Sequence, residues 1–341
     1  MSTTVTERPS RTTLFDGLGR YIPIGVTVAL LIVMYLGGIA AFPRFSSPQV
    51  IASLFIDNAA LLIIAVGMTF VILSGGIDLS VGSMMAFSTM SIAALTVDLG
   101  VPAEVAVAAV LAFGTLSGLF TGAVIHYFNV QPFIATLAGL FLYRGLTLQL
   151  SDHDVSMRDI AFFDWGMLRM DFAGGQRDGG FSLPNISFIA LAVVIVAFIV
   201  LHYTRFGRGV YAVGGSESSA LLMGLPVART KVGVYAVSGF CAALGGVVAA
   251  YYTKSANPLA GVGLELDAIA AVVIGGTILT GGTGFVLGTV AGVMVMGLLT
   301  TLIAFQGDLS SWWARIVVGV LLLAFILLQR FLSRSGEKRR T

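Results

Sequence analysis

The stretch PNISFIALAVVIVAFIVLHY, residues 184–203, contains no Asp, Glu, Lys or Arg. About 20 apolar residues in a row are enough for a helix to cross the hydrocarbon core of a bilayer. Similar runs recur from Tyr21 to Phe331, with the charged residues gathered in short stretches between them. Only 11% of the chain is charged, whereas soluble domains carry about 25%. The sequence therefore predicts an all-α polytopic membrane protein, because β-barrel strands are shorter and alternate in polarity.

Ten membrane spans are predicted, and the eighth is so short that a re-entrant segment is an alternative there. The spans are residues 21–42, 54–73, 79–97, 104–126, 131–150, 184–203, 231–252, 266–280, 284–304 and 313–332. They make residues 21–332 one membrane domain, between an N-terminal tail (1–20) and a basic C-terminal tail (333–341). The first 20 residues show no cleavage pattern of a signal peptide, so we expect the first span to be retained.

The distribution of charge predicts the orientation. Lys and Arg stay preferentially on the cytoplasmic side of a membrane protein. If the N-terminus is cytoplasmic, the cytoplasmic segments and their flanks hold 12 of the 19 Lys and Arg residues but only 5 of the 17 Asp and Glu residues. We therefore expect both termini in the cytoplasm of a bacterium, with the chain in its inner membrane.

Several function classes are excluded by what the sequence lacks. No basic stripe with interleaved aromatic residues suggests nucleic-acid binding. Three scattered histidines and the single Cys241 have no metal-ligand spacing, so no metal site is predicted. No GxxxxGK[ST] phosphate loop occurs, and no nucleophile–histidine pattern suggests an enzyme. We expect this chain to bind no cofactor and to have no catalytic residues, so that any ATP and its magnesium would be bound by another subunit.

Two loops are long enough to have a role of their own. Residues 151–183, on the predicted periplasmic side, are rich in Asp and carry glycine pairs. They predict an irregular cap that either spaces two spans or docks an external partner. Residues 204–230, on the cytoplasmic side, contain one short helix after Gly214 and Gly215. Its predicted residues are Ser216 as N-cap, Glu217 in the first turn, the apolar Ala220, Leu221, Leu222 and Met223, and the terminating Gly224 and Leu225.

A helix this short cannot bury an apolar face alone. Spacing leaves two interpretations equally open: the face packs against its own bundle, or it fills a groove on a cytoplasmic partner.

Polar and glycine-rich positions within the apolar runs are the candidates for a transport pathway. Charges inside a bilayer are costly and are often functional. The candidates are Asp57, Asn58, Ser74, Gly75, Gly76, Asp78, Arg144, Glu265, Asp267 and Thr277. Each has a plainer alternative, because carboxylates at helix starts suit the helix dipole and Arg144 could extend to the interface.

The glycine-rich segments raise the question of a repeat. Ile-Leu-Ser-Gly-Gly at 72–76 is similar to Ile-Leu-Thr-Gly-Gly at 278–282. Transporters are often built from repeats, but these segments lie six predicted spans apart. That offset would make the repeat parallel, and a short match of small residues can also arise by chance.

Three motifs together resemble a known family. They are GMTFVILSGGIDLSVGS (67–83), RFGRGVYAVGGSESSALLMGL (205–225) and GVGLELDAIAAVVIGGTILTGGTGFVLGT (261–289). In this order they resemble the ribose/xylose-type permeases of bacterial ABC sugar importers, over about residues 20–332. Details such as LSSWWARIVVGVLL (309–322) are most similar to the permeases of galactofuranose importers.

The resemblance implies a type II importer fold with an inverted 5+5 relation between its halves. It also implies a second, related permease chain, a cytoplasmic ATPase with two nucleotide-binding halves, and a periplasmic sugar-binding protein. Residues 204–230 would be the region that couples to the ATPase. The chain would form half of the pathway for a monosaccharide, galactofuranose or another pentose or hexose.

Two alternatives remain. A branched-chain amino-acid permease is the nearest within the same superfamily, but SGGIDLSVGS (74–83) resembles the sugar branch. An ion-coupled transporter should carry carboxylates deep in its spans, whereas here the carboxylates are predicted near the span ends.

Overall fold

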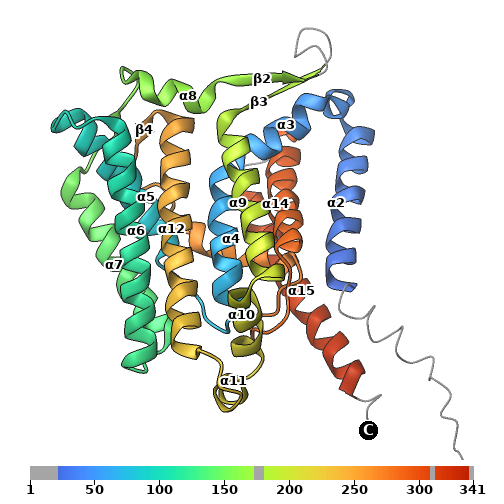
Figure 1. The fold of residues 1–341 in the computed structure, drawn as a ribbon. Helices are drawn as coiled ribbons and strands as arrows, with labels where there is room; N and C mark the ends of the chain where they lie inside the picture. Colours follow the sequence, from blue (N-terminus) through green and yellow to red (C-terminus); the bar gives the residue numbers. More distant parts are fainter. Residues whose placement is uncertain (1–21, 173–179, 308–311, 338–341) are drawn as a thin grey trace, which may run out of the picture.

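The computed structural model describes residues 22–172, 180–307 and 312–337, with side chains up to residue 327. The predicted tail 1–20, glycines 174, 175 and 179 of the cap, and residues 338–341 lie outside the described residues. Long helices run roughly parallel and form one bundle (Figure 1). One end of the bundle carries a β-hairpin and is called the hairpin end; the opposite end carries the short helix α11 and is called the α11 end.

The first half of the chain is helical. It contains α2 (Ile22–Ala41), the 3-10 turn η1 (Pro43–Ser46), α3 (Pro48–Asp57), α4 (Ala59–Leu73), α5 (Val81–Ala93), the π-helical turn η2 (Ala94–Asp98), α6 (Ala103–Tyr127) and α7 (Pro132–Leu150). The second half contains α9 (Asn185–Tyr203), α10 (Arg205–Gly215), α11 (Glu217–Leu222), α12 (Val227–Thr253), α13 (Leu264–Ile274), α14 (Val286–Gln306) and α15 (Trp312–Glu337).

The hairpin end is covered by the segment between α7 and α9. It contains β1 (Val155–Ser156), η3 (Ala161–Phe163), α8 (Asp164–Met167), β2 (Arg169–Phe172) and β3 (Phe181–Pro184). Strands β2 and β3 form an antiparallel hairpin, and β1 pairs with β4 (Ser255–Ala256) through Val155 and Ala256. The predicted irregular cap is therefore more ordered than expected, because it pairs with itself and with the segment after α12.

The all-α polytopic class is confirmed. Among the described residues, seven helices are long and apolar enough to cross a membrane, and an eighth span is formed if α3 and α4, bent by 57°, count as one. Helix α15 adds a shorter apolar helix, Trp312–Leu327. The eighth predicted span, 266–280, is wrong as a complete span: α13 has 11 residues. At about 1.5 Å per residue it reaches about half of a ~30 Å hydrocarbon core.

Glycines let the long helices approach each other closely. A methyl group on Gly118 of α6 would overlap the carbonyl oxygen of Tyr235 on α12, and one on Gly239 of α12 would overlap that of Gly114. Cys241 is likewise fully covered, since a methyl group on Gly67 of α4 would lie 2.7 Å from its Cβ. The segment GFCAALGG (239–246) is thus a packing surface, and not a break in a helix.

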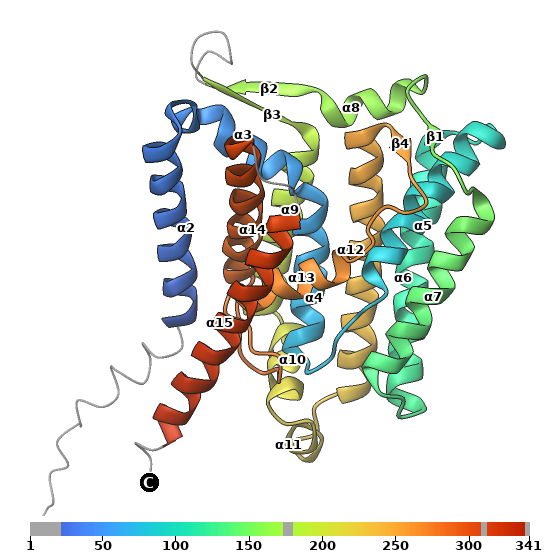
Figure 2. The same cartoon turned by 180° about the vertical axis from the view of Figure 1, so that it is seen from behind.

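Two true breaks interrupt the bundle. Helix α4 runs to the α11 end, and residues 74–80, the first break, return toward the middle, where α5 begins (Figure 2). Helix α12 runs to the hairpin end, and residues 254–263, the second break, return toward the middle, where α13 begins. The two units run in opposite directions, as an inverted relation between the halves would require.

Candidate functional site

The predicted short helix of the 204–230 loop is α11. Ser216 caps it, because its hydroxyl accepts a hydrogen bond from the Ser219 amide at 3.2 Å. Glu217 lies in the first turn and accepts a hydrogen bond from Lys231 of α12 at 2.6 Å. Gly224, with φ +73°, ends the turn that follows. The polar groups of α11 thus anchor it to the start of α12.

The apolar residues of α11 divide between two faces. Ala220 is fully buried and packs with Val213, Val227 and Leu225. Leu221, Leu222 and Met223 are 66%, 89% and 68% exposed. One side of α11 therefore packs on the bundle, as the first interpretation predicted, while three large apolar side chains extend away from it. That these side chains fill a groove on a partner stays a prediction.

Asp78, in the first break, is a buried carboxylate. It is 3% exposed, although the sequence placed it in a turn near the end of a span. Its Oδ1 accepts hydrogen bonds from the amide and the hydroxyl of Ser80, at 2.9 and 2.6 Å. Its Oδ2 accepts one from Ser238 of α12 at 2.7 Å. The expectation that all carboxylates stay near the span ends is wrong for Asp78, and three donors compensate its burial.

The other candidates of the first break, Ser74, Gly75 and Gly76, precede Asp78 in the sequence. Ser74 is half-buried and its hydroxyl donates to the carbonyl oxygen of Val71 at 2.8 Å. Gly75 has φ +83°, which favours glycine. A methyl group on Gly76 would overlap the buried hydroxyl of Tyr235, which has no hydrogen-bond partner among the described residues. These residues allow α4 to stop and the chain to return.

The N-termini of α5 and α13 meet in the middle of the bundle. A methyl group on Gly82 of α5 would lie 2.5 Å from the carbonyl oxygen of Gly261 and would overlap the Glu265 carboxylate. Exposed apolar side chains lie beside this contact, at Leu259, Val262 and Leu266. In Figure 2, α13 is seen between α15 and α5, where no other helix covers it. Glu265 is half-buried and lies against Gly82, where the two breaks converge.

Arg144 fastens the second break. From α7, its guanidinium donates hydrogen bonds to the carbonyl oxygens of Pro258 at 2.8 Å and Ala260 at 2.9 Å. Glu265 attracts the same guanidinium electrostatically. Arg144 therefore does not extend to the interface, because its donors hold the backbone of the second break. Its role in a pathway stays a prediction.

The remaining candidates are dispersed. Asp267 of α13 interacts electrostatically with Arg315 of α15. Thr277 is fully buried beneath Gly284, without a hydrogen-bond partner for its hydroxyl among the described residues. Asn58 lies in the bend between α3 and α4, where its Nδ2 donates to the Leu54 carbonyl oxygen at 2.9 Å. The structure thus brings Glu265 and Arg144 together but leaves these three apart from them.

Asp57 lies at the hairpin end and accepts a hydrogen bond from Tyr252 at 2.9 Å. A cavity of about 590 Å³ opens beside it, lined by η1, α3 and the end of α14.

Three residues that hold the breaks were missed from the sequence. Ser80 and Ser238 satisfy Asp78. The Thr136 hydroxyl of α7 donates to Pro132 in its own helix at 2.8 Å and, more weakly, to the Ile77 carbonyl oxygen at 3.3 Å. Ser80 follows Asp78 by two residues, a spacing typical of an Asx turn. No local signal identifies Ser238 or Thr136, since each lies far away in the sequence.

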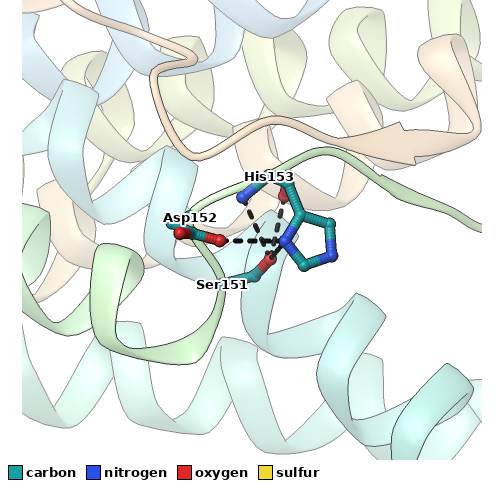
Figure 3. Close-up of polar contacts among 3 residues, drawn as sticks. All are labelled: Ser151, Asp152 and His153. Carbon is teal, nitrogen blue, oxygen red and sulfur yellow. Dashed lines mark hydrogen bonds and ion pairs between the residues drawn. The ribbon is translucent and has the colours of Figure 1, made fainter.

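Within residues 22–172, 180–307 and 312–337, no group of three His, Cys, Asp or Glu residues could hold a metal ion. Figure 3 shows Ser151, Asp152 and His153 in contact, but they are consecutive residues at the hairpin end, and Asp152 and His153 are exposed. The hydroxyl of Ser151 donates to the His153 carbonyl oxygen at 2.9 Å, so these contacts stabilise a turn.

A family model described as the permease component of branched-chain amino acid transport systems matches residues 50–326. The chain belongs to this permease family. Its relatives include the inner membrane ABC transporter permease protein YjfF of Escherichia coli, 44% identical over 94% of this chain and 96% of the relative. The fructose import permease protein FruG of Bifidobacterium longum is 42% identical over 93% and 94%.

The ribose import permease protein RbsC of Bacillus subtilis is 38% identical, over 93% of this permease and 94% of the relative. No solved structure matches the chain. The resemblance to sugar ABC importer permeases of the ribose type is confirmed, and the permease is a multi-pass membrane protein. The amino-acid alternative is not favoured, because these relatives are named for ribose and fructose.

Proposed function

We propose that this permease is the non-catalytic membrane subunit of an ABC sugar importer, driven by a separate ATPase. The proposal rests on the exposed apolar side chains of α11. Leu221, Leu222 and Met223 extend from the α11 end, while Ala220 anchors the helix to the bundle. Large apolar side chains exposed together at a membrane protein's polar end favour docking into a groove of a partner. In this proposal the α11 end and both termini are cytoplasmic, in a bacterial inner membrane, and ATP and magnesium are bound by the ATPase.

The surface around α13 is the proposed half of a translocation pathway. The two breaks converge there, Glu265 is half-buried, and Leu259, Val262 and Leu266 are exposed. A second, related permease would cover this surface and complete the pathway for a monosaccharide, galactofuranose or another pentose or hexose. A periplasmic sugar-binding protein would deliver the sugar at the hairpin end. Weak contacts suit such a pathway, because a transported ligand must also leave.

Charge placed on α11 tests the coupling role. Leu221→Asp and Leu222→Asp should each leave the bundle folded but reduce co-purification of the ATPase from mild detergent, since each buries a carboxylate in an apolar contact. Ser218→Asp is the matched control, because it adds the same charge at an exposed polar position of α11. Normal co-purification of the ATPase with both leucine variants would contradict the role of α11.

The buried Asp78 is the one observation that favours an ion-coupled transporter instead. Uptake into vesicles distinguishes the two. Transport that requires ATP, the ATPase and the binding protein supports the importer, whereas transport driven by an ion gradient alone supports the alternative.

A further inference from the structure

Three backbone segments meet directly above α11. They are the end of α4, the end of α10 and the loop between α13 and α14. The Gly282 amide donates a hydrogen bond to the Leu73 carbonyl oxygen at 2.9 Å. A methyl group on Gly214 would overlap that same carbonyl oxygen and would lie 2.6 Å from the Gly282 nitrogen. No side chain can therefore separate α10 from the other two segments at this point.

Gly281 makes a second set of contacts between the same three segments. A methyl group on Gly281 would lie 2.8 Å from the Gly75 nitrogen and 3.0 Å from the Gly214 carbonyl oxygen. Gly281 and Gly282 have φ values of +86° and +76°, which side chains rarely adopt. We call Gly75, Gly214, Gly281 and Gly282 the glycine junction. Space requires glycine at Gly214, Gly281 and Gly282. Backbone conformation requires it at Gly75, Gly281 and Gly282.

Each segment of the junction leads to a different functional part. Gly214 precedes Ser216, the N-cap of α11, by two residues. Gly75 precedes Asp78, which is bonded at the start of α5, by three residues. Gly282 belongs to the loop that follows α13, and Tyr211 of α10 donates a hydrogen bond to Gly284 of this loop at 2.9 Å. The junction thus links α11 to the segment that leads into α5 and to the loop that follows α13, the two helices whose N-termini meet near Gly82.

Contact between backbones transmits displacement with little loss. Long side chains at an interface absorb small shifts by changing rotamer, whereas close-packed backbone atoms cannot move independently. We propose that Gly214 and Gly282 are positioning residues of the transport cycle, which divide a displacement of α11 between the first break and the loop after α13. This inference rests on the proposed function, in which the ATPase moves α11.

Neighbouring glycines provide the test and its control. Gly214→Ala places a methyl group against Leu73 and Gly282, whereas a methyl group on Gly215 meets nothing within 4 Å. Both variants keep Leu221, Leu222 and Met223, so both should co-purify with the ATPase like the wild type. Gly214→Ala should lower ATP-driven uptake by about tenfold or more relative to Gly215→Ala, within the usual range of coupling between linked sites. Its complex should also lose the stimulation of ATP hydrolysis by sugar-loaded binding protein.

The outcomes separate the inference from the proposed function. Equal uptake by the two alanine variants would overturn the role of the junction. Absence of the ATPase from the wild-type preparation would instead overturn the proposed function. If Gly214→Ala does not fold, Tyr211→Phe decides, because it removes the hydrogen bond to Gly284 and adds no volume. Reduced uptake by Tyr211→Phe with normal ATPase binding supports the inference, and full uptake overturns it.

Discussion

The two breaks of the bundle are held by opposite charges. In the first break, Asp78 accepts hydrogen bonds from Ser80 and Ser238. In the second break, Arg144 donates hydrogen bonds to the carbonyl oxygens of Pro258 and Ala260. The Ser80 amide that Asp78 accepts from lies at the start of α5, where backbone amides of a helix have no partner within the helix. In the second break, the unpaired backbone groups are instead the carbonyl oxygens of Pro258 and Ala260. The sign of each charge thus follows from the backbone groups that its break leaves unpaired.

The breaks also differ in burial. Asp78 is almost fully buried, while Arg144 is half-buried. Removing a partner from a buried charged hydrogen bond is more costly than removing one near water. Changes at Asp78 should therefore act mainly on stability, and changes at Arg144 mainly on transport.

Asp78→Ala should have the largest effect. It leaves the hydroxyl groups of Ser80 and Ser238 without their acceptor and should lower the free energy of unfolding by about 3 kcal/mol. Thermal unfolding of the permease purified in detergent measures the loss. Asp78→Asn is the control, because its amide oxygen still accepts the Ser80 amide, and its melting temperature should fall less. A wild-type melting temperature for Asp78→Ala would show that the first break does not depend on the carboxylate.

Arg144→Ala should cost about 1.5 kcal/mol of stability, because two carbonyl oxygens lose a charged donor at a half-buried position. Uptake should fall more clearly than the melting temperature, since the second break leads directly into α13. Arg144→Lys, which retains a charged donor, should recover part of the uptake. Unchanged uptake by Arg144→Ala would show that transport does not depend on the hydrogen bonds by which Arg144 holds the second break.

Thr136→Val tests the hydrogen bond to Ile77, a weaker contact of the first break than those of Asp78. Valine has a similar shape but cannot donate to Ile77, and the 3.3 Å bond should contribute about 0.5 kcal/mol. Thr147→Val is the matched control on the same helix, since the Thr147 hydroxyl donates to Tyr143 within α7. The melting temperature of Thr136→Val should lie slightly below that of this control; the reverse order would remove α7 from the support of the first break.

His153→Ala, outside both breaks, should have the smallest effect. The hydrogen bond from His153 lowers the pKa of the exposed Asp152 carboxyl below its ordinary value. A lowered folded-state pKa contributes stability above the unfolded pKa, and this contribution is lost as the pH falls through the folded value. Melting temperatures of wild type and His153→Ala should therefore differ slightly at neutral pH and converge in acid. Loss of uptake in His153→Ala would assign this turn a role that its exposure does not suggest.

Prediction from the sequence succeeded where a signal was local. The apolar runs predicted the membrane class, and Ser216, Glu217 and Gly224 predicted the extent of α11 from capping chemistry alone. It failed where partners are distant in the sequence. The burial of Asp78 depends on Ser238, 160 residues away, and the role of Arg144 depends on carbonyl oxygens more than 110 residues away. The ten full spans were overcounted because an apolar run does not reveal that α13 stops after 11 residues.

The similarity between residues 72–76 and 278–282 does not mark an inverted repeat. Both segments lie at the α11 end, and their glycines contact each other in the glycine junction. Equivalent segments of an inverted pair would lie at opposite ends. The two Gly-Gly pairs meet different requirements: Gly281 and Gly282 approach the backbone of Gly214, whereas Gly75 has a positive φ and Gly76 lies against Tyr235.

The position of Cys241 has a practical consequence. It is the only cysteine of the chain, and its side chain on α12 is buried against Gly67 of α4. Thiol-reactive probes will not reach it in the folded permease. The wild-type sequence can therefore serve directly as the background for site-directed fluorescence labelling. A single cysteine introduced at the exposed Ser218 of α11 would carry the fluorophore and report the approach of the ATPase. No residue of the membrane core would need to be replaced first.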